Sequence, residues 1–217
     1  MDDYILYGYF RSSAAFRARI ALNLKGIVPA LRFVHLLKDG GQQHAPEYRA
    51  LNPQELIPAL VHDGHTITQS LAIVEYLDEL VPQPPLLPKD AFGRARVRAL
   101  AYAVACDIHP VNNLRIGQYI KRTFGRSDED VFDWHRHWIT LGFDALETML
   151  AGEPQTGRFC HGDTPSLADI CLVPQVFNAR RMKLDVARWP TIARIEAEAL
   201  AQPAFDAAQP KNQPDAE

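Results

Sequence analysis

Hydrophobic positions along the first third of the chain follow two different periods. Residues 4–9 (YILYGY) are rich in aromatic and branched side chains and alternate as a half-buried strand does. From Ser13 to Lys25 the apolar residues recur at spacings of three and four, and Gly26 follows, which predicts a helix with a glycine stop. Over residues 1–82 the pattern gives strand, helix, strand, helix, strand, strand and helix. This order predicts an α/β domain of the thioredoxin-like type.

A proline-rich stretch marks the end of this first pattern. The segment PQPPLLPKD cannot continue a helix, so residues 83–88 are predicted to form an extended linker. From there the spacing is helical, and residues 89–217 are predicted to form an all-α domain. The expected helices span residues 92–123, 128–150 and 166–181, with a shorter one after Pro190.

Local signals fix several helix ends. In the segment GDTPSLADI, Ser166 is predicted to cap a helix while Asp169, three residues on, reaches back to it. Ser70 is likewise expected to cap the helix that runs to Leu80. The segment QPKNQPDAE at 209–217 is polar and contains proline, so it is predicted to be frayed.

Composition and charge exclude several classes of function. Apolar residues make up 47% of the chain, and its acids and bases are interspersed to a formal net charge of -3. A global field for nucleic acid or anionic lipid is therefore missing, so no nucleic-acid or membrane partner is predicted. No apolar run approaches the roughly 18 residues of a membrane span. The first residues also lack the features of an export signal, so a cytoplasmic protein is expected.

The three cysteines indicate neither a metal site nor a redox motif. Cys106, Cys160 and Cys171 have neither CxxC nor metal-finger spacing. They are expected to be buried, reduced core residues, and no metal ligand is predicted anywhere in the chain.

The start of the first predicted helix is the candidate site of chemistry. Free amides and the helix dipole stabilise an anion there, and a redox thioredoxin would place CxxC at this point. Here the segment reads FRSSAAFR, and no cysteine occurs before Cys106. Thiolate chemistry at this helix would therefore need a sulfur brought by a ligand, and glutathione is the obvious one. Ser12 and Ser13 could hydrogen-bond that sulfur and lower its pKa, or they could simply cap the helix.

Two further segments favour a glutathione site over simple capping. In LIPAL, Pro58 precedes a strand, and in thioredoxin-like folds this proline is cis, which leaves the backbone of Ile57 free to pair with a peptide ligand. In ITQSLAI, Gln69 and Ser70 stand at a second helix start, suited to a carboxylate. Each feature alone could be a turn, a cap or a packing proline. Their occurrence in this order favours the site.

These motifs resemble the zeta class of glutathione transferases over nearly the whole chain. The segments that carry the resemblance are YFRSSAAFRARIALNLKG, KDGGQQ, ALNPQELIPAL, TQSLAIVEYL, CDIHPVNNLRIGQYI, GDTPSLADICLVPQV and NARRMKLD. The resemblance implies a homodimer that uses glutathione to isomerise maleylacetoacetate to fumarylacetoacetate in tyrosine and phenylalanine catabolism. Many members read SSC where this chain has Ala14, so any part that this cysteine plays is absent here. Related maleylpyruvate isomerases keep the first serine, so Ser12 is expected to activate the thiol with Ser13 assisting.

The helical domain is expected to supply cations, because the implied substrates are small dicarboxylates. His109 and Asn113 are implied to contact glutathione, with the substrate carboxylate as the alternative partner of His109. From the residues alone, His109 could equally be a core histidine with its hydrogen bonds satisfied inside the protein. Arg115 and Arg181 are implied to bind substrate, and Arg11 to complete a positive ring around the sulfur. For each arginine a solvated or dimer-contact role is the alternative.

Three other functions stay open from the sequence. Maleylpyruvate isomerase shares the cation requirement, since its substrate differs only in length. A general conjugating transferase would need a more apolar pocket than these cations allow. A non-enzymatic binding protein that keeps the fold would fail to bind glutathione.

Overall fold

The computed structural model describes residues 4–217 and divides into two compact units. The first unit comprises the chain up to Leu86 together with Ala201–Glu217, and the second comprises Leu87–Leu200. Over residues 4–217, no helix combines the length and the apolar character needed to cross a membrane.

A four-stranded mixed sheet forms the centre of the first unit. Its strands are β1 (Ile5–Gly8), β2 (Ala30–Phe33), β3 (Ala59–His62) and β4 (His65–Thr68), in the order β2-β1-β3-β4. Strand β1 is parallel to β2 and antiparallel to β3, and β3 and β4 form an antiparallel hairpin. The hairpin turns at Asp63 and Gly64, whose φ angles of 48° and 77° are those of a tight two-residue turn. The predicted order of strands and helices is confirmed.

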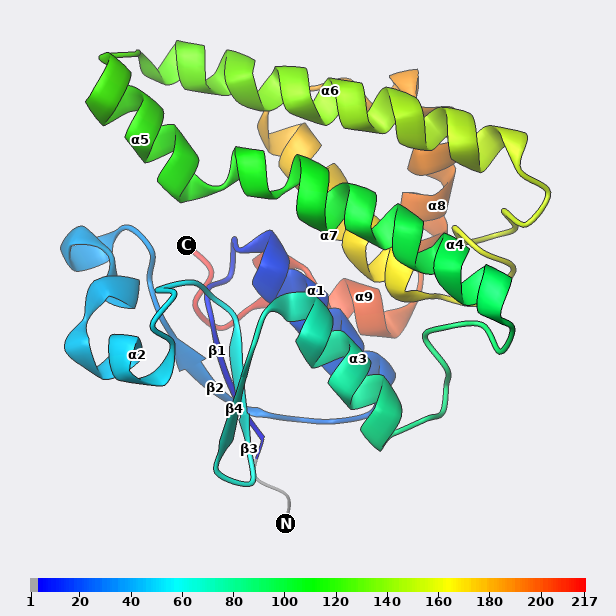
Figure 1. Cartoon of the computed structure of the whole chain (residues 1–217), viewed down its shortest axis with the longest axis horizontal. Helices are drawn as coiled ribbons and strands as arrows, with labels where there is room; N and C mark the ends of the chain where they lie inside the picture. The colour runs from blue at the N-terminus through cyan, green and yellow to red at the C-terminus, as the bar shows by residue number, and fades with distance from the viewer. Residues whose placement is uncertain (1–3) are drawn as a thin grey trace. The chain divides into compact units, whose positions relative to one another are not determined.

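Within residues 4–86, the helices α1 (Ser13–Leu24), α2 (Pro46–Leu51) and α3 (Ser70–Leu80) accompany this sheet (Figure 1). Helices α1 and α3 lie together on one side of the sheet, and α2 lies on the other. Ten successive residues of α1 are buried because small alanines let it pack closely on both the sheet and α3. The loops that precede α1 and α3 therefore lead into helices of the same layer.

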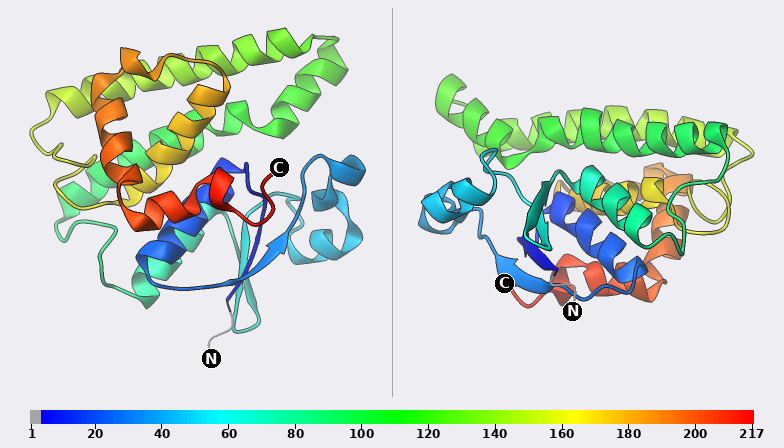
Figure 2. Two further views of the ribbon diagram at one scale, coloured as in Figure 1. Left: turned by 180° about the vertical axis from the view of Figure 1, so that it is seen from behind. Right: turned by 60° about the horizontal axis from the view of Figure 1, so that its bottom comes forward.

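The C-terminal segment belongs to the first unit, which differs from the predicted boundary at residues 89–217. Helix α9 (Pro203–Ala208) lies beside α1, as both views of Figure 2 show. Asn23 of α1 donates from Nδ2 to the Ala204 carbonyl at 2.9 Å, and the ring of Phe205 is fully buried. The prediction of a frayed end was also wrong, because side-chain hydrogen bonds hold residues beyond α9. Composition could not reveal these long-range partners.

The second unit is all helical. Its main elements are α4 (Ala91–Tyr102), a π-helical wide turn (Ala103–Ile108), a 3₁₀ turn (Pro110–Asn112), α5 (Leu114–Phe124), α6 (Asp128–Gly152), α7 (Leu167–Arg181) and α8 (Pro190–Leu200). Helix α7 is central, packing against α4 and α8. The single helix predicted for residues 92–123 is wrong. His109 N–H bonds back five residues to the Val104 carbonyl at 2.8 Å, and Pro110 then has no N–H to continue the ladder.

The predicted capping box at the start of α7 is confirmed. Oδ2 of Asp169 accepts from both the Ser166 N–H at 2.8 Å and the Ser166 hydroxyl at 2.7 Å. Its Oδ1 accepts from the Cys160 N–H at 2.8 Å. Burial raises the pKa of the Asp169 carboxyl, and these hydrogen bonds oppose the rise. One buried carboxylate thus ties the α7 start to the preceding loop.

Replacing Asp169 by Ala should lower the free energy of unfolding by about 2–3 kcal/mol, because buried N–H groups lose their acceptor. Urea unfolding followed by circular dichroism measures this change. Asp133→Ala, at an exposed position on α6, is the control and should change stability by less than about 0.5 kcal/mol. Equal stability of the two variants would contradict the structural role of Asp169.

Candidate functional site

The turn between β1 and α1 presents Ser12 as the cap of α1. Ser12 Oγ accepts from the Ala15 N–H at 3.1 Å, while its own N–H donates to the Tyr9 carbonyl at 3.0 Å. A serine hydroxyl has one donor hydrogen besides its acceptor lone pairs, so this cap leaves the O–H available to an incoming anion. Capping and anion binding, which the sequence left as alternatives, are therefore compatible. Ser13 is the first helical residue and is buried, whereas Ser12 is partly exposed.

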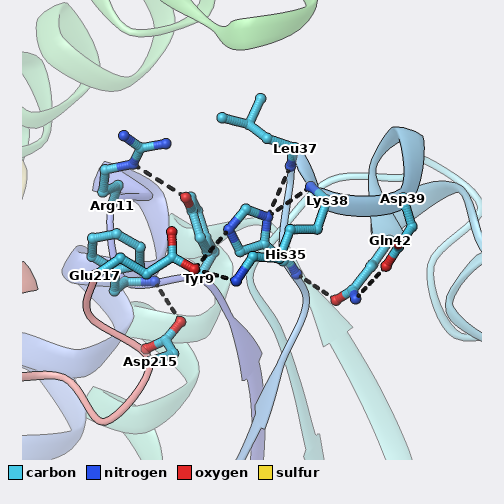
Figure 3. Close-up of polar contacts among 10 residues, drawn as sticks. Tyr9, Arg11, His35, Leu37, Lys38, Asp39, Gln42, Asp215 and Glu217 are labelled. Carbon is cyan, nitrogen blue, oxygen red and sulfur yellow. Dashed lines mark hydrogen bonds and ion pairs between the residues drawn. The ribbon is translucent and has the colours of Figure 1, made fainter.

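Arg11 stands next to this helix start on an aromatic support. Its Nε donates to the Tyr9 hydroxyl at 3.2 Å, as Figure 3 shows. The guanidinium carbon lies 5.6 Å from the centre of the Tyr9 ring and 5.4 Å from that of Phe10. Such cation–π contacts hold a charged group in place while leaving part of it open to solvent. A positive charge held by aromatic contacts therefore lies beside the α1 N-terminus.

The segment before β3 contains a peptide group that makes no hydrogen bond within residues 4–217. The Ile57–Pro58 bond is cis, as predicted. The Leu56 carbonyl accepts two hydrogen bonds, from the Tyr48 hydroxyl and from Asn52 Nδ2, both at 2.6 Å. Among residues 4–217, by contrast, the N–H and C=O of Ile57 have no hydrogen-bond partner. Burial raises the pKa of Tyr48 to about 12, so its phenol remains a donor near neutral pH.

A hydrophobic cluster links this segment to the Ser12 turn. The side chain of Ile57 packs in one buried cluster with Tyr9, Phe10, Val34 and Tyr48. The peptide of Ile57 and the turn that carries Ser12 therefore rest on the same support. A shift of one would disturb the other, because packed cores do not deform freely.

The start of α3 differs from the prediction in one detail. Ser70 is the first helical residue rather than the cap, and Gln69 occupies the cap position without a capping hydrogen bond. Arg17 Nε donates to Ser70 Oγ at 3.0 Å, and both residues are buried. As at Ser12, an occupied lone pair leaves the hydroxyl hydrogen for another acceptor. Sequence reasoning missed Arg17, although its position one turn after Ser13 was a usable signal.

Gln69 has a backbone conformation that is rare for residues other than glycine. Its φ is 67° and its ψ is 117°, and its Nε2 donates to Gln54 Oε1 at 2.9 Å. Backbone outliers of this kind cost on the order of 1–3 kcal/mol and cluster at ligand-binding sites. The Gln69 side chain thus lies next to Ser70 in sequence on a backbone whose conformation costs folding free energy.

The cost at Gln69 can be measured with a pair of variants. Gln69→Gly should be more stable than Gln69→Ala by about 1 kcal/mol, because glycine adopts this conformation without a Cβ clash. Both variants lose the contact with Gln54, so the difference reports the backbone alone. Urea titration of the two proteins measures it, and a less stable Gly variant would show that the backbone is unstrained.

In the second unit, the break between the wide turn and α5 carries three of the predicted residues. His109 is partly buried at the end of the wide turn. Asn113 caps α5, where its Oδ1 accepts from the Arg115 N–H at 3.2 Å. The Arg115 side chain is exposed. The structure therefore brings the three residues together along one short segment.

Arg181 ends α7 as an exposed side chain beside His135 of α6. The pKa of His135 is lowered, chiefly by burial and further by the charge of Arg181. The Nε2 atom of His135 is buried without a hydrogen-bond partner among the described residues. His135 is partly buried on α6, close enough to Arg181 to feel its charge. An imidazole next to Arg181 was invisible to helical spacing because the two residues come from different helices.

The cysteines match the prediction only in part. Cys160 and Cys171 are buried and free, but Cys106 is exposed, contrary to expectation. Burial raises the pKa of the Cys160 thiol well above its usual value, so that thiol is unreactive. Across residues 4–217, no three His, Cys, Asp or Glu side chains are grouped as metal ligands.

Comparison with known proteins assigns a protein family to both units. Residues 6–85 match the family model of the glutathione S-transferase N-terminal domain, and residues 141–204 match that of the C-terminal domain. The chain is 52% identical, over the full length of both chains, to a probable maleylacetoacetate isomerase of Vibrio cholerae.

Two solved structures are similar over nearly the whole chain. One is a holo maleylpyruvate isomerase described as a bacterial zeta-class glutathione S-transferase, with a TM-score of 0.95, 47% identity, and coverage of 98% of this chain and 100% of that one. The other is a maleylacetoacetate isomerase from Methylobacterium extorquens AM1 with bound malonate and GSH. It has a TM-score of 0.94, 44% identity, and coverage of 98% and 99%.

Proposed function

This chain belongs to the zeta class of the glutathione transferase family, and we propose that it isomerises maleylacetoacetate to fumarylacetoacetate with glutathione as cofactor. One observation carries the proposal. The α1 N-terminus presents the Ser12 hydroxyl, yet the chain has no cysteine before Cys106. A site built to stabilise a thiolate, without a thiol of its own, fits a sulfur that a ligand brings.

The donors of the first unit fit each part of glutathione. The O–H of Ser12 suits the sulfur, and the free peptide group of Ile57 suits the tripeptide backbone. The hydroxyl of Ser70 is oriented by its hydrogen bond from Arg17. Together with the α3 N-terminus and Gln69, it suits a carboxylate of glutathione. Each of these residues can contact glutathione while it keeps the hydrogen bonds described above.

When bound, glutathione supplies a thiolate whose reversible addition to the cis double bond permits rotation about that bond. Ser12 donates a hydrogen bond to the sulfur, with Ser13 assisting, and the α1 dipole adds positive potential. Arg11 extends that potential over the same helix end and lowers the free energy of negative charge that develops on the substrate.

The cations of the second unit are proposed to hold the substrate carboxylates. Arg181 and Arg115 are exposed and carry donors that suit carboxylates, and His109 and Asn113 lie beside Arg115 in sequence. The relative from Methylobacterium extorquens AM1 has malonate, a small dicarboxylate, bound together with GSH. That ligand pair supports a site for an acidic substrate over a site for bulky apolar electrophiles.

Replacing Arg181 by Ala should raise KM for maleylacetoacetate about 10- to 100-fold, because one charge-assisted hydrogen bond to the substrate is lost. KM for glutathione should stay within about twofold. Arg122→Ala is the matched control, because Arg122 is also an exposed arginine near a helix end. Steady-state kinetics with each substrate varied in turn measures both constants. Equal KM values in the two variants would remove Arg181 from the substrate site.

Maleylpyruvate is the second candidate substrate, because a maleylpyruvate isomerase is among the similar structures. Both substrates offered together should each be converted, and the ratio of their kcat/KM values identifies the preferred one. A larger kcat/KM for maleylpyruvate would reassign the substrate and leave the chemistry unchanged.

The proposed reaction is tested by counting thiols during turnover. Protein, maleylacetoacetate and a small amount of glutathione are mixed, and the trans product and free thiol are both measured. An isomerase yields many products per glutathione with the thiol conserved, whereas a conjugating transferase consumes one thiol per product. A non-enzymatic binding protein of the kind considered from the sequence yields neither product and lacks the thermal stabilisation of roughly 2.7 kcal/mol expected at a hundred times the dissociation constant.

We further propose that the protein is a homodimer and acts in the cytoplasm, as the zeta-class resemblance implies. Light scattering coupled to gel filtration measures the mass in solution. A mass of one 24.4 kDa chain would contradict the dimer.

A further inference from the structure

The turn that carries Ser12 is fixed by side chains remote from it in sequence. The Ser12 N–H to Tyr9 carbonyl bond makes Phe10 and Arg11 its two central residues. The Phe10 N–H donates to Asp215 Oδ2 at 2.9 Å, across 205 residues of sequence. The Phe10 carbonyl accepts from Arg19 Nη2 at 3.1 Å. Both backbone polar groups of Phe10 are thus satisfied from outside the turn.

Asp215 is itself held in place by a folded C-terminal segment. Three turns follow α9, with N–H to carbonyl bonds from Asn212 to Gln209, from Gln213 to Pro210 and from Ala216 to Gln213, at 3.0, 3.2 and 3.0 Å. The Gln213 side chain also donates to the carbonyls of Ala207 and Gln209, each at 2.9 Å. The carboxylate of Asp215 therefore reaches Phe10 from an ordered support.

Arg19 connects the same elements from the other side. Its side chain is buried, and besides Phe10 it donates from Nε to the Ala208 carbonyl at 3.0 Å and from Nη1 to the Tyr9 carbonyl at 3.5 Å. Burial lowers the pKa of Arg19 to about 10, and the negative charge of Asp215 opposes this shift. Arg19 therefore remains charged near neutral pH.

A second contact of the C-terminal segment, made by Glu217, contributes less to holding the segment in place. Glu217 pairs with Lys38, and its Oε1 lies 3.6 Å from His35 Nε2. Lys38 and Glu217 are both more than half exposed, and exposed pairs are worth at most about 1 kcal/mol. Of these two contacts made by the C-terminal segment, the one between Asp215 and Phe10 therefore acts on the turn.

We propose that Asp215 is a positioning residue for catalysis: it fixes Phe10 and thereby aims the Ser12 hydroxyl at the thiol of bound glutathione. The inference rests on the proposed function of Ser12. A displacement of about 1 Å at a reacting group can cost up to about a hundredfold in rate. A turn released at Phe10 can shift by such an amount while the sheet and helices stay folded.

The test compares three variants of the full chain. Asp215→Ala removes the acceptor, Asp215→Asn keeps an amide oxygen in its place, and Asp206→Ala is the control. Asp206 lies in the same C-terminal segment, and its carboxylate accepts from Gln209. The readouts are the pKa of the glutathione thiol when bound, from the ultraviolet absorbance of the thiolate against pH, and kcat/KM for isomerisation. Circular dichroism establishes that each variant is folded.

Asp215→Ala is expected to raise the pKa of the bound thiol and to lower kcat/KM about tenfold. Asp215→Asn should restore most of both quantities, and Asp206→Ala should match the wild type. If Asp215→Ala does not fold, Asp215→Glu takes its place, because one added methylene displaces the acceptor while the charge is kept.

Two results would overturn this inference alone: a wild-type thiol pKa in Asp215→Ala (or its substitute), or an Asn variant as impaired as the Ala variant. Wild-type protein that leaves the thiol pKa of glutathione unshifted would instead contradict the proposed function and this inference together.

Discussion

Without glutathione, isomerisation of maleylacetoacetate by this protein should fall more than about a thousandfold, to the uncatalysed rate. The reason is chemical, since the Ser12 site stabilises a thiolate that the chain does not contain. The assay follows the absorbance of the substrate with and without the cofactor. S-methylglutathione is the matched control, because it keeps both carboxylates and the peptide but cannot form a thiolate.

The exposed thiol of Cys106 must be separated from the cofactor in this experiment. Cys106→Ala should show the same dependence on glutathione as the wild type. Turnover that persists in the wild type without any added thiol, and disappears in Cys106→Ala, would transfer the nucleophile to the protein and contradict the account of the Ser12 site.

Replacing Ser12 by Ala should lower kcat/KM about 10²- to 10³-fold, the usual effect of losing one donor to a developing or stabilised anion. The pKa of the bound glutathione thiol should rise in the same variant. Ser13→Ala should cost about tenfold or less, because Ser13 is buried and only assists. Rates at saturating glutathione, measured against pH, give both the rate and the pKa.

Ser12 also caps α1, so stability and catalysis need separate controls. Ser12→Ala should lose about 1 kcal/mol of folding free energy together with the rate. Ser12→Asp keeps a cap for the Ala15 N–H but offers the sulfur a negative charge in place of a donor. It should therefore be as stable as the wild type and at least as inactive as the Ala variant. An active Asp variant would mean that capping alone is the role of Ser12.

Local patterns predicted much of the first unit. The hydrophobic period and the Gly26 stop located α1, and Asp63 with Gly64 located the hairpin, because each signal acts within a few residues. The same holds for the Ser166 and Asp169 capping box. These features depend on hydrogen bonds between near neighbours in sequence, which a sequence shows directly.

Long-range contacts explain what the sequence did not predict. The C-terminal segment looked frayed because its residues are polar, yet Asp215 finds its partner 205 residues away. Arg17 looked like one more helical charge, and its role depends on Ser70 of another helix. The lowered pKa of His135 on α6 depends on burial and on the charge of Arg181 at the end of α7, which helical spacing within α6 does not reveal. In each case a polar side chain owes its position to an element that is distant in the chain.

The most direct test of the thiolate site is a crystal structure of the protein with glutathione bound. We expect the glutathione sulfur within hydrogen-bond reach of Ser12 Oγ, at roughly 3–3.5 Å, with the peptide paired to Ile57 and a carboxylate at Ser70. A sulfur that points away from the α1 N-terminus, or a tripeptide bound elsewhere, would contradict this expectation.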